Sequence, residues 1–262
     1  MIDLHVHLMP GWDDGAGTLE EARVMADVAR RDGITKMAAT PHVFRMTKHD
    51  GDWEELADRV DWFKAAVAAG GFPCEVFWGA EVYIQPDIVF NLRKHGLTIN
   101  GSDYFFIEFA AEGLIPRAKE FLFSLLIDGF IPIISHPERN ADFQARPRLL
   151  YEFVKMNCLA QVTAKSILGG FGPEAKKAAD VFLKHNLVHI IASDAHDAMG
   201  RPPRLRRAVD EAAKITGKAR AEAMVTEIPQ AILDNEEIGE WGEPENPAKG
   251  RKSWMIRLPW KK

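Results

Sequence analysis

Two histidines separated by one residue, His5 and His7, are the first candidates for chemistry in this chain. If residues 1–8 form a β-strand, its side chains alternate between two faces, so Asp3, His5 and His7 are expected on one face. The opposite face is then apolar, with Ile2, Leu4, Val6 and Leu8. Neutral imidazole nitrogen is the commonest protein ligand for transition metals. A His-x-His pair also occurs without a metal, so the pair alone leaves open a metal site and a buried histidine pair.

Further histidines and carboxylates stand near the ends of the other strands expected below. The complete set is His5, His7, Asp14, His42, Glu81, Glu108, His136, Asp194 and His196. Burying so many charges is costly unless cations compensate them. The set exceeds the needs of one ion, so we expect two or three divalent metal ions that share bridging carboxylates. Nitrogen and oxygen ligands without a thiolate suit manganese, iron or zinc better than calcium or magnesium alone.

Such a metal centre is typical of phosphoester hydrolysis. Clustered divalent ions lower the pKa of a bridging water to give hydroxide near neutral pH, and they neutralise phosphoryl oxygens during in-line attack. Arg139 and Arg201 each lie just beyond one of the candidate histidines. Because arginine binds phosphate in a bidentate manner, we interpret both as phosphate-binding residues. The alternative is a surface arginine paired with a local carboxylate such as Glu138 or Asp197.

Neither cysteine fits the active site of a cysteine-dependent phosphatase. An arginine is missing six positions after Cys74 and Cys158, where Ala80 and Ala164 stand. We expect both thiols to be buried as small apolar side chains. The histidines that the metal site does not need are His49, His95, His185 and His189.

Strands and helices alternate along the chain. Thr18 begins a helix as the N-cap of a capping box that includes Glu21, and Gly33 ends this helix. Later strands are expected over residues 36–40, 75–82, 104–109, 131–135, 159–164 and 189–193. With the first strand included, this alternation predicts a parallel sheet that closes, or nearly closes, into an α/β barrel. The candidate ligands follow the carboxyl ends of the strands, where such barrels carry their chemistry.

The composition is that of a soluble globular protein, with 47% hydrophobic and 27% charged residues among 262. No apolar run reaches the roughly 18 residues that cross a bilayer, and residues 1–8 lack the features of a signal peptide. We therefore expect no transmembrane segment and a cytoplasmic location. The net charge of -5 gives no electrostatic reason to expect nucleic-acid binding.

The barrel is expected over residues 1–238, and residues 239–262 form a tail rich in charged residues and tryptophan. The tail tryptophans are Trp241, Trp254 and Trp260. One interpretation is a partly ordered tail whose tryptophans pack on the barrel. The other is a basic, aromatic anchor that makes weak contact with an anionic membrane surface or a partner.

Seven short motifs, in matching order over residues 1 to about 235, resemble the polymerase-and-histidinol-phosphatase (PHP) superfamily. They are more closely similar to the bacterial tyrosine-protein phosphatases of capsular and exopolysaccharide operons. The motifs are Ile2-Asp3-Leu4-His5-Val6-His7, Asp13-Asp14-Gly15, Ala39-Thr40-Pro41-His42, Gly79-Ala80-Glu81-Val82, Ile107-Glu108-Phe109, His136-Pro137-Glu138-Arg139-Asn140 and Ala192-Ser193-Asp194-Ala195-His196.

The resemblance implies a distorted (β/α)7 barrel of the PHP type, with a trinuclear site in which all nine residues above are ligands. It also implies that Arg139 and Arg201 bind phosphate. The implied substrate is phosphotyrosine in the tail of a membrane-associated tyrosine autokinase that controls polysaccharide export. Manganese is the metal we expect, with iron or zinc as alternatives. The chain departs from the family pattern after His42, where Val43-Phe44-Arg45 replaces the second polar residue or histidine of many relatives.

Together these observations predict a metal-dependent phosphotyrosine-protein phosphatase. A metal-bridged hydroxide would attack phosphorus without a covalent enzyme intermediate. Phenolate, with a reference pKa of about 10, is a tolerable leaving group beside cations, so we assign no general acid. One rival is a phosphatase for a small metabolite such as histidinol phosphate, or another phosphoesterase on the same scaffold. A second rival is a non-catalytic metal-binding scaffold that recruits a kinase.

Overall fold

The strands of this protein form a curled parallel sheet. The structure is a computed structural model that describes residues 1–44, 52–85, 88–239 and 241–250. The strands are β1 (Ile2–Val6), β2 (Lys36–Ala39), β3 (His42–Val43), β4 (Glu75–Trp78), β5 (Glu81–Tyr83), β6 (Tyr104–Glu108), β7 (Ile131–Ile134), β8 (Leu159–Thr163) and β9 (Ile190–Ala192). They pair in the orders β1-β2-β4 and β3-β5-β6-β7-β8-β9. A parallel bridge between Val6 and Ala195 brings the segment after β9 against β1 and joins the two ends of the curl.

The strand expected over residues 75–82 is interrupted in the middle, and the strand expected over residues 36–40 is followed by a short extra strand. Thr40 and Pro41 separate β2 from β3, and Gly79 and Ala80 separate β4 from β5. A Cβ at position 79 would be tightly packed, because it would lie 3.3 Å from Thr40 Cγ2 and 3.4 Å from Ile99 Cα. When each interrupted pair is counted as one strand, the chain follows the expected series of seven strands. The distorted α/β barrel is therefore confirmed.

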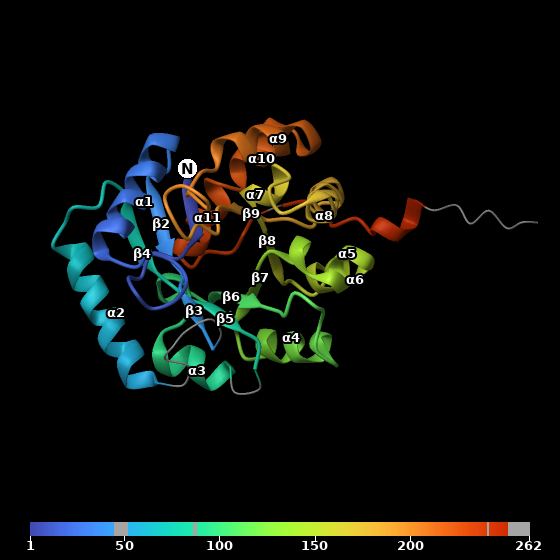
Figure 1. The fold of residues 1–262 in the computed structure, drawn as a ribbon. Coiled ribbons are helices and arrows are strands. Elements are labelled where there is room, and N and C mark those ends of the chain that lie inside the picture. Colours follow the sequence, from blue (N-terminus) through green and yellow to red (C-terminus); the bar gives the residue numbers. More distant parts are fainter. Residues whose placement is uncertain (45–51, 86–87, 240, 251–262) are drawn as a thin grey trace, which may run out of the picture.

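Helices surround the strands, as Figure 1 shows. The first helix begins and ends as predicted, because Thr18 accepts a hydrogen bond from Glu21 N and Gly33 adopts a φ of 96°. The helices are α1 (Leu19–Asp32), α2 (Trp53–Ala68), α3 (Ile88–His95), α4 (Ala118–Ile127), α5 (Ala141–Ala145), α6 (Arg148–Val154), α7 (Ala164–Ile167), α8 (Pro173–Lys184), α9 (Arg206–Thr216), α10 (Lys218–Ala223) and α11 (Glu227–Leu233). Single 3-10 turns are η1 (Ile99–Gly101), η2 (Pro137–Arg139) and η3 (Pro247–Gly250).

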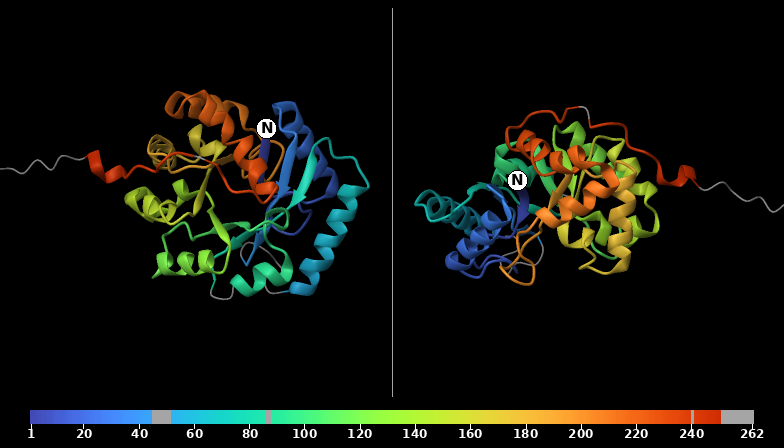
Figure 2. Two further views of the ribbon diagram at one scale, coloured as in Figure 1. Left: turned by 180° about the vertical axis from the view of Figure 1, so that it is seen from behind. Right: turned by 90° about the horizontal axis from the view of Figure 1, so that it is seen from above.

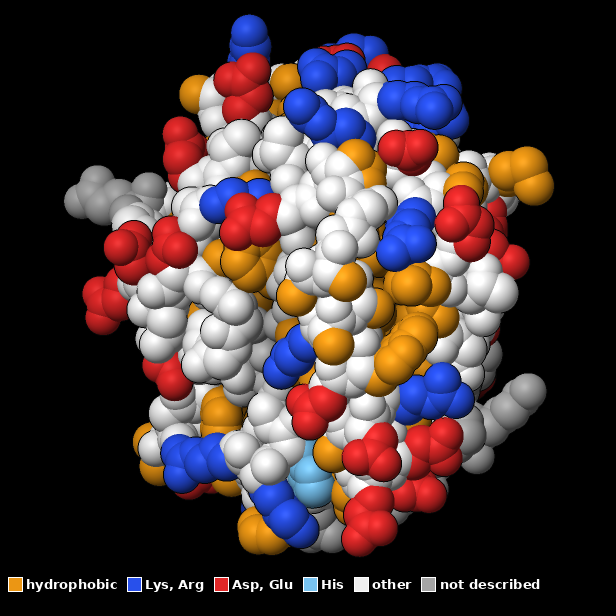
Figure 3. Space-filling view, turned by 90° about the vertical axis from the view of Figure 1, so that its left-hand side faces the viewer, with side chains coloured by type: hydrophobic (Ala, Val, Ile, Leu, Met, Phe, Trp, Pro, Cys, Tyr) orange, Lys and Arg blue, Asp and Glu red, His pale blue; other side chains and the backbone are white. Residues whose placement is uncertain are grey.

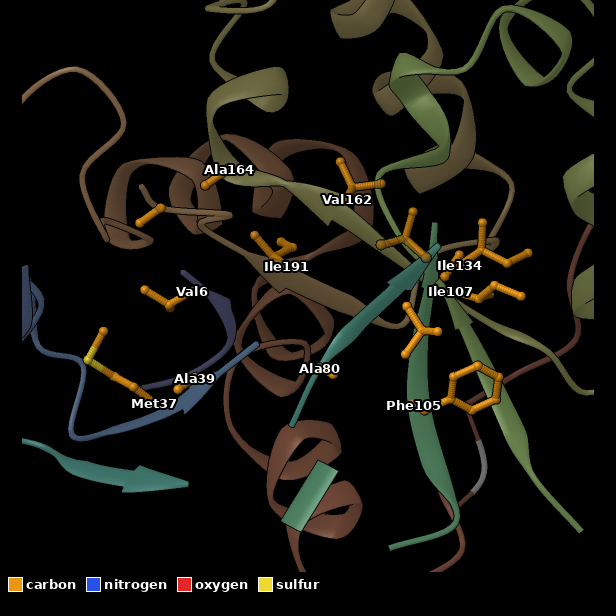
Figure 4. Packing of buried hydrophobic residues seen from close by; sticks show 14 of the residues in the cluster. Val6, Met37, Ala39, Ala80, Phe105, Ile107, Ile134, Val162, Ala164 and Ile191 are labelled. Atoms are coloured by element: carbon orange, nitrogen blue, oxygen red, sulfur yellow. The ribbon is translucent and has the colours of Figure 1, made fainter. Parts of the chain in front are cut away.

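Two hydrophobic clusters hold the barrel together. One contains Leu4, Phe106 and Ile133 of the strands with Ile228 and Ile232 of α11, so α11 closes one end of the barrel. The other packs the opposite faces of the strands against the surrounding helices. Figure 4 labels members of this second cluster on the strands and on the segments that follow them, namely Val6, Met37, Ala39, Ala80, Phe105, Ile107, Ile134, Val162, Ala164 and Ile191.

The strict alternation expected for residues 1–8 is wrong. Ile2 and Leu4 belong to the cluster closed by α11, whereas Val6 and Leu8 belong to the outer cluster. The register of β1 against β2 shifts between Asp3 and Val6, and this irregularity changes which side chains share a face. As a result His5 lies beside the same cluster as Leu4, and its ring centroid is 4.7 Å from that of Phe106.

The described part of the tail lies against the barrel. After α11 the chain crosses the back of the molecule, seen on the left of Figure 2. Trp241 donates a hydrogen bond from Nε1 to Val188 O at 3.0 Å, and the Arg220 guanidinium lies 4.3 Å from the centroid of its ring. The other two tail tryptophans, Trp254 and Trp260, lie outside the described residues. Within the described ranges, none of the helices combines the length and the apolar character needed to span a membrane.

Candidate metal centre

All nine side chains predicted as ligands meet at the carboxyl ends of the strands. Four of them lie on β1, β3, β5 and β6, and the others lie in the loops that follow β1, β7 and β9. Eight of the nine residues are buried, and Asp14 is the exception, with its side chain 39% exposed. His136 and Asp194 hold positive φ angles of 32° and 52°. Such backbone costs about 1–3 kcal/mol per residue and is concentrated at functional sites.

Glu81 lies at the centre of the group. Its Oε1 is 2.9 Å from His136 Nε2, and its Oε2 is 3.0 Å from His42 Nδ1 and 3.3 Å from His5 Nε2. His7 Nε2 lies 3.7 Å from the same Oε2 atom. One carboxylate therefore has four imidazoles around it, so Glu81 is the residue best placed to hold more than one cation if ions bind here.

The nearby ligand atoms form three overlapping groups, each with its atoms within 4.8 Å of one another. The groups share His7, His42 and Glu81. Of these, only the Glu81 carboxylate has two oxygens that could serve neighbouring ions, since a neutral imidazole offers one nitrogen to a metal. Asp194 adds a further oxygen, since its Oδ1 lies 3.4 Å from His7 Nε2. Ligand atoms that bind one ion at about 2 Å lie roughly 3–3.5 Å apart. The distances therefore suit more than one divalent ion.

Buried atoms without hydrogen-bond partners provide the test of this fit. Among the described residues, His5 Nε2, His7 Nε2, His42 Nδ1 and Glu81 Oε2 are buried and make no hydrogen bond. The three nitrogens face Glu81 Oε2 at ion-pair distances of 3.0–3.7 Å without a hydrogen bond of good geometry, and native structures contain few buried polar atoms of this kind. Their concentration at one point fits a group of cations that binds all four. The donor set, nitrogen and oxygen without sulfur, fits divalent transition metals.

Two residues that orient the histidines were not assigned from the sequence. Asp13 Oδ2 lies 2.7 Å from His7 Nδ1, and Gln161 Oε1 lies 3.1 Å from His5 Nδ1. Each contact leaves the Nε2 atom of the histidine facing the centre, as is usual for metal-binding imidazoles. The sequence contained a signal for each of these two residues. Asp13 precedes a candidate ligand, and Gln161 is a buried amide in the middle of strand β8.

The electrostatics of the site favour ionised carboxylates. Burial opposes the ionisation of Glu81, but the surrounding imidazoles outweigh it and hold the pKa of Glu81 well below its usual range. Burial likewise opposes the ionisation of Asp194, and Arg139 is the main group that lowers its pKa. For His7, burial is outweighed by Asp13, and the pKa rises to about 10. Protons on imidazoles thus balance the carboxylates until cations displace them, so ion binding is expected to release protons.

Both predicted arginines converge on one carboxylate oxygen. Arg139 Nη1 and Arg201 Nη2 each donate a hydrogen bond to Asp194 Oδ2 at 2.7 Å. The alternative partners are engaged elsewhere. Glu138 accepts hydrogen bonds from Ser166 Oγ and Thr163 N, and Asp197 accepts from the backbone of its own loop. The two guanidinium groups therefore belong to the site and not to local surface ion pairs.

The remaining candidates lie away from this centre. His95 stacks on Trp53, and His189 Nδ1 accepts a hydrogen bond from Ala160 N. Burial raises the pKa of Cys158 to about 12, so its thiol is unreactive at neutral pH. His49 and Arg45, the latter in the segment that departs from the family pattern, lie outside the described residues.

Relatives with similar sequences bear phosphatase names. The chain is 32% identical over 253 residues to "Tyrosine-protein phosphatase YwqE" of Bacillus subtilis (strain 168), with 96% of this chain and 98% of the relative covered. It is 28% identical over 239 residues to "Tyrosine-protein phosphatase CpsB" of Streptococcus pneumoniae, with 89% and 98% covered.

Solved structures agree with the fold. A structure described as YwqE from Bacillus subtilis and CpsB from Streptococcus pneumoniae, "unique metal-dependent tyrosine phosphatases", matches with a TM-score of 0.83, 32% identity and coverage of 94% of this chain and 99% of that one. A histidinol phosphate phosphatase from Lactococcus lactis subsp. lactis Il1403 has a TM-score of 0.52 at 12% identity, covers 83% and 93%, and shows likeness of fold alone. The family model for "Capsular polysaccharide synthesis, CpsB/CapC" matches residues 1–234. This chain belongs to the CpsB/CapC family of capsular polysaccharide synthesis.

Proposed function

We propose that this chain is a metal-dependent phosphatase that hydrolyses phosphotyrosine in the tail of a membrane-associated tyrosine autokinase of polysaccharide export. The observation that carries the proposal is the cluster of buried histidine and carboxylate atoms beside two arginines. The names of relatives that align with most of the chain support phosphotyrosine as the substrate class. A cytoplasmic location is part of the same proposal.

The metal centre would consist of two or three divalent ions. The residues that would hold them are His5, His7, Asp14, His42, Glu81, Glu108, His136, Asp194 and His196. When bound, such ions lower the pKa of a water molecule to near neutrality and offset the negative charge of phosphoryl oxygens. We propose manganese, with iron or zinc as alternatives, because the donor set suits all three.

Arg139 and Arg201 would hold the phosphoryl group. Each side chain is about one quarter exposed, at 24% and 26%, while one of its nitrogens is fixed on Asp194. The remaining N–H groups are then available for an anion, and Arg201 Nε is buried with no hydrogen-bond partner in the described part of the chain. Guanidinium groups bind phosphate oxygens in pairs, so the two residues would fix the orientation of the ester.

Phe171 would keep these arginines in place. Its ring centroid is 4.9 Å from the guanidinium carbon of Arg139 and 5.7 Å from that of Arg201. Cation–π contacts of this kind contribute about 0.5–2 kcal/mol and restrict the orientation of the guanidinium group. The departing phenolate has a reference pKa of about 10, so hydrolysis does not require a protonating side chain.

The test is hydrolysis of a phosphotyrosine peptide by protein that has been stripped of metal and reloaded with manganese. We expect metal-dependent release of inorganic phosphate, inhibition by a chelator, and a lower kcat/KM on histidinol phosphate. His95→Ala is a control variant, because His95 lies outside the site, and it should behave like the wild type. Greater efficiency on histidinol phosphate would favour the metabolite phosphatase. Full biological function of Arg139→Ala and His136→Ala variants would favour the non-catalytic scaffold.

A further inference from the structure

Two grooves of opposite charge flank the loop of residues 197–200, which follows the last candidate ligand. The first is a cavity of about 430 Å³, and we call it the basic groove. Its cationic lining consists of Arg31, Lys165, Arg201, Arg204 and Arg207. The second is a cavity of about 770 Å³, and we call it the acidic groove. Its acidic lining consists of Asp14, Glu20, Glu21 and Asp197, and its described lining contains no lysine or arginine.

The lining of the basic groove carries more positive than negative charge, although Arg31 pairs with Asp27 and Arg201 with Asp194 outside it. Asp32 is the one carboxylate in that described lining, and its Oδ2 already accepts hydrogen bonds from Leu205 N and Arg206 N at 2.7 and 2.9 Å. Arg204 and Arg207 are exposed, and Glu211 on α9 is close enough to interact electrostatically with Arg207. Figure 3 shows Lys and Arg side chains gathered at the upper edge of the face that carries α1.

The basic groove begins at Arg201, one of the two arginines proposed to bind phosphate. Arg201 lines it and also donates to Asp194 in the metal centre. Phe171 lines it as well, and the same residue lines a smaller cavity with His136 and Arg139. Lys165 lies between these parts, with Nζ donating to Gly200 O at 3.0 Å and 5.1 Å from the centroid of the Phe171 ring. A peptide whose phosphotyrosine occupies the metal centre can therefore place a neighbouring residue in the basic groove.

We infer that the basic groove is a subsite for a second anionic side chain of the substrate peptide. This inference rests on the proposed function, and it adds a preference for acidic or multiply phosphorylated segments. The acidic groove on the other side of the loop would repel the same peptide, so the two grooves together set the direction in which the chain lies. The ligand chemistry is a negatively charged side chain, supplied by a second phosphotyrosine or by a carboxylate.

The test compares three peptides that differ at one position close to the phosphotyrosine under attack. That position carries a second phosphotyrosine, a glutamate or a glutamine, and kcat/KM is measured for the first phosphate released. We expect the two anionic peptides to exceed the neutral peptide by about five- to tenfold, the effect of one or two partly exposed ion pairs. Raising the ionic strength should reduce this ratio, because exposed charges are screened within about 10 Å at 0.1 M salt.

The variant Arg204→Ser with Arg207→Ser should bring the ratio close to one. Replacing both residues by lysine should restore most of the ratio, because the charge is kept. Lys64→Ser with Lys177→Ser removes the same charge from exposed positions outside both groove linings, and this control should keep the wild-type ratio. Thermal melting of each variant verifies that the fold is intact.

The outcomes separate the subsite from the activity on which it rests. A larger ratio for the second phosphotyrosine than for glutamate identifies phosphate as the preferred anion, and equal ratios identify negative charge alone. Hydrolysis of all three peptides with a wild-type ratio near one overturns the subsite and leaves the phosphatase standing. A loss of the ratio in the lysine-64 and lysine-177 control also overturns it. No hydrolysis of any peptide by the manganese-loaded protein overturns both.

Discussion

The two ends of the barrel hold polar side chains in opposite ways. At the carboxyl ends of the strands, His5 Nε2 and Glu81 Oε2 are buried without hydrogen bonds. At the other end, Asn100 Nδ2 donates to Leu233 O at 2.9 Å, Tyr104 OH donates to Glu236 O at 2.8 Å, and Trp241 Nε1 donates to Val188 O. One end groups residues that could hold cations, and the other closes the fold with hydrogen bonds that are already formed.

This difference predicts how substitutions at each end will act. At the carboxyl ends of the strands, which we call the metal end, buried histidines and carboxylates crowd together. Bound ions would compensate them, so changes there should affect activity and the stabilisation that ions provide. We call the opposite end of the barrel, where the described tail packs, the tail end. Changes there should lower the free energy of unfolding and leave activity unaltered. The predictions below test this separation, beginning with the largest effect.

Glu81→Gln should lower kcat/KM on a phosphotyrosine peptide by about 10³-fold, because bound ions supply several kcal/mol of transition-state stabilisation. The same change should remove most of the rise in Tm that manganese produces. For the wild type at 100 times Kd that rise corresponds to about 2.7 kcal/mol. Thermal melts and metal analysis measure both effects. An unchanged manganese-dependent Tm shift in the variant would contradict the central position of Glu81.

Arg139→Lys and Arg201→Lys should each lower kcat/KM by about 10²-fold, since a lysine cannot bind phosphate in a bidentate manner. Both variants should keep their metal content, because the lysines retain the charge beside Asp194. Steady-state kinetics and metal analysis of the same samples are the measurements. Loss of metal in parallel with activity would show instead that the arginines act by holding Asp194.

Much of this site was predictable because ligand spacing and strand ends are local features of the sequence. His5 and His7, or Asp194 and His196, stand two residues apart, and parallel strands bring their carboxyl ends to one edge. The partners of these residues were harder to predict. Gln161 reaches His5 across 156 positions, and such a contact depends on the closure of the barrel and not on local spacing.

The fold, like the site, was predictable where it depends on local sequence patterns and not where it depends on tertiary contacts. The alternation of strands and helices predicted the barrel, but not the register shift in β1 or the interruptions near Gly79. These irregularities arise where neighbouring strands approach closely, so they depend on tertiary contacts. The basic groove likewise combines Arg31 with Arg204 and Arg207, residues that are far apart in the sequence.

At the tail end, Trp241→Ala should lower the free energy of unfolding by about 2–3 kcal/mol, through lost burial, a lost hydrogen bond and a lost cation–π contact with Arg220. Urea denaturation measures this change, and kcat/KM at 25 °C should stay at the wild-type value. Trp62→Ala is the matched control, because Trp62 is 45% exposed on α2 and should change stability by less than about 0.5 kcal/mol. A loss of activity in folded Trp241→Ala would break the separation of the two ends.

His189 provides the smallest test, and it concerns pH. Burial lowers the pKa of His189 to about 3, and its Nδ1 accepts a hydrogen bond from Ala160 N, so the folded protein keeps this imidazole neutral. The unfolded chain takes up a proton near its ordinary pKa of about 6.5. The contribution of His189 to stability is therefore complete above pH 6.5 and declines as the pH falls towards 3.

The wild type should consequently lose about 1 kcal/mol more than His189→Gln between pH 6.5 and 5.5, because each pH unit changes one such linkage by about 1.4 kcal/mol at most. Urea denaturation of metal-free protein at pH 6.5 and 5.5 isolates the contribution of His189 to the free energy of unfolding. The acid-sensitive histidines of the metal end are common to both proteins and cancel in the comparison. Equal losses in the two proteins would mean that His189 titrates normally. The acid sensitivity of the metal-free protein would then arise from residues other than His189.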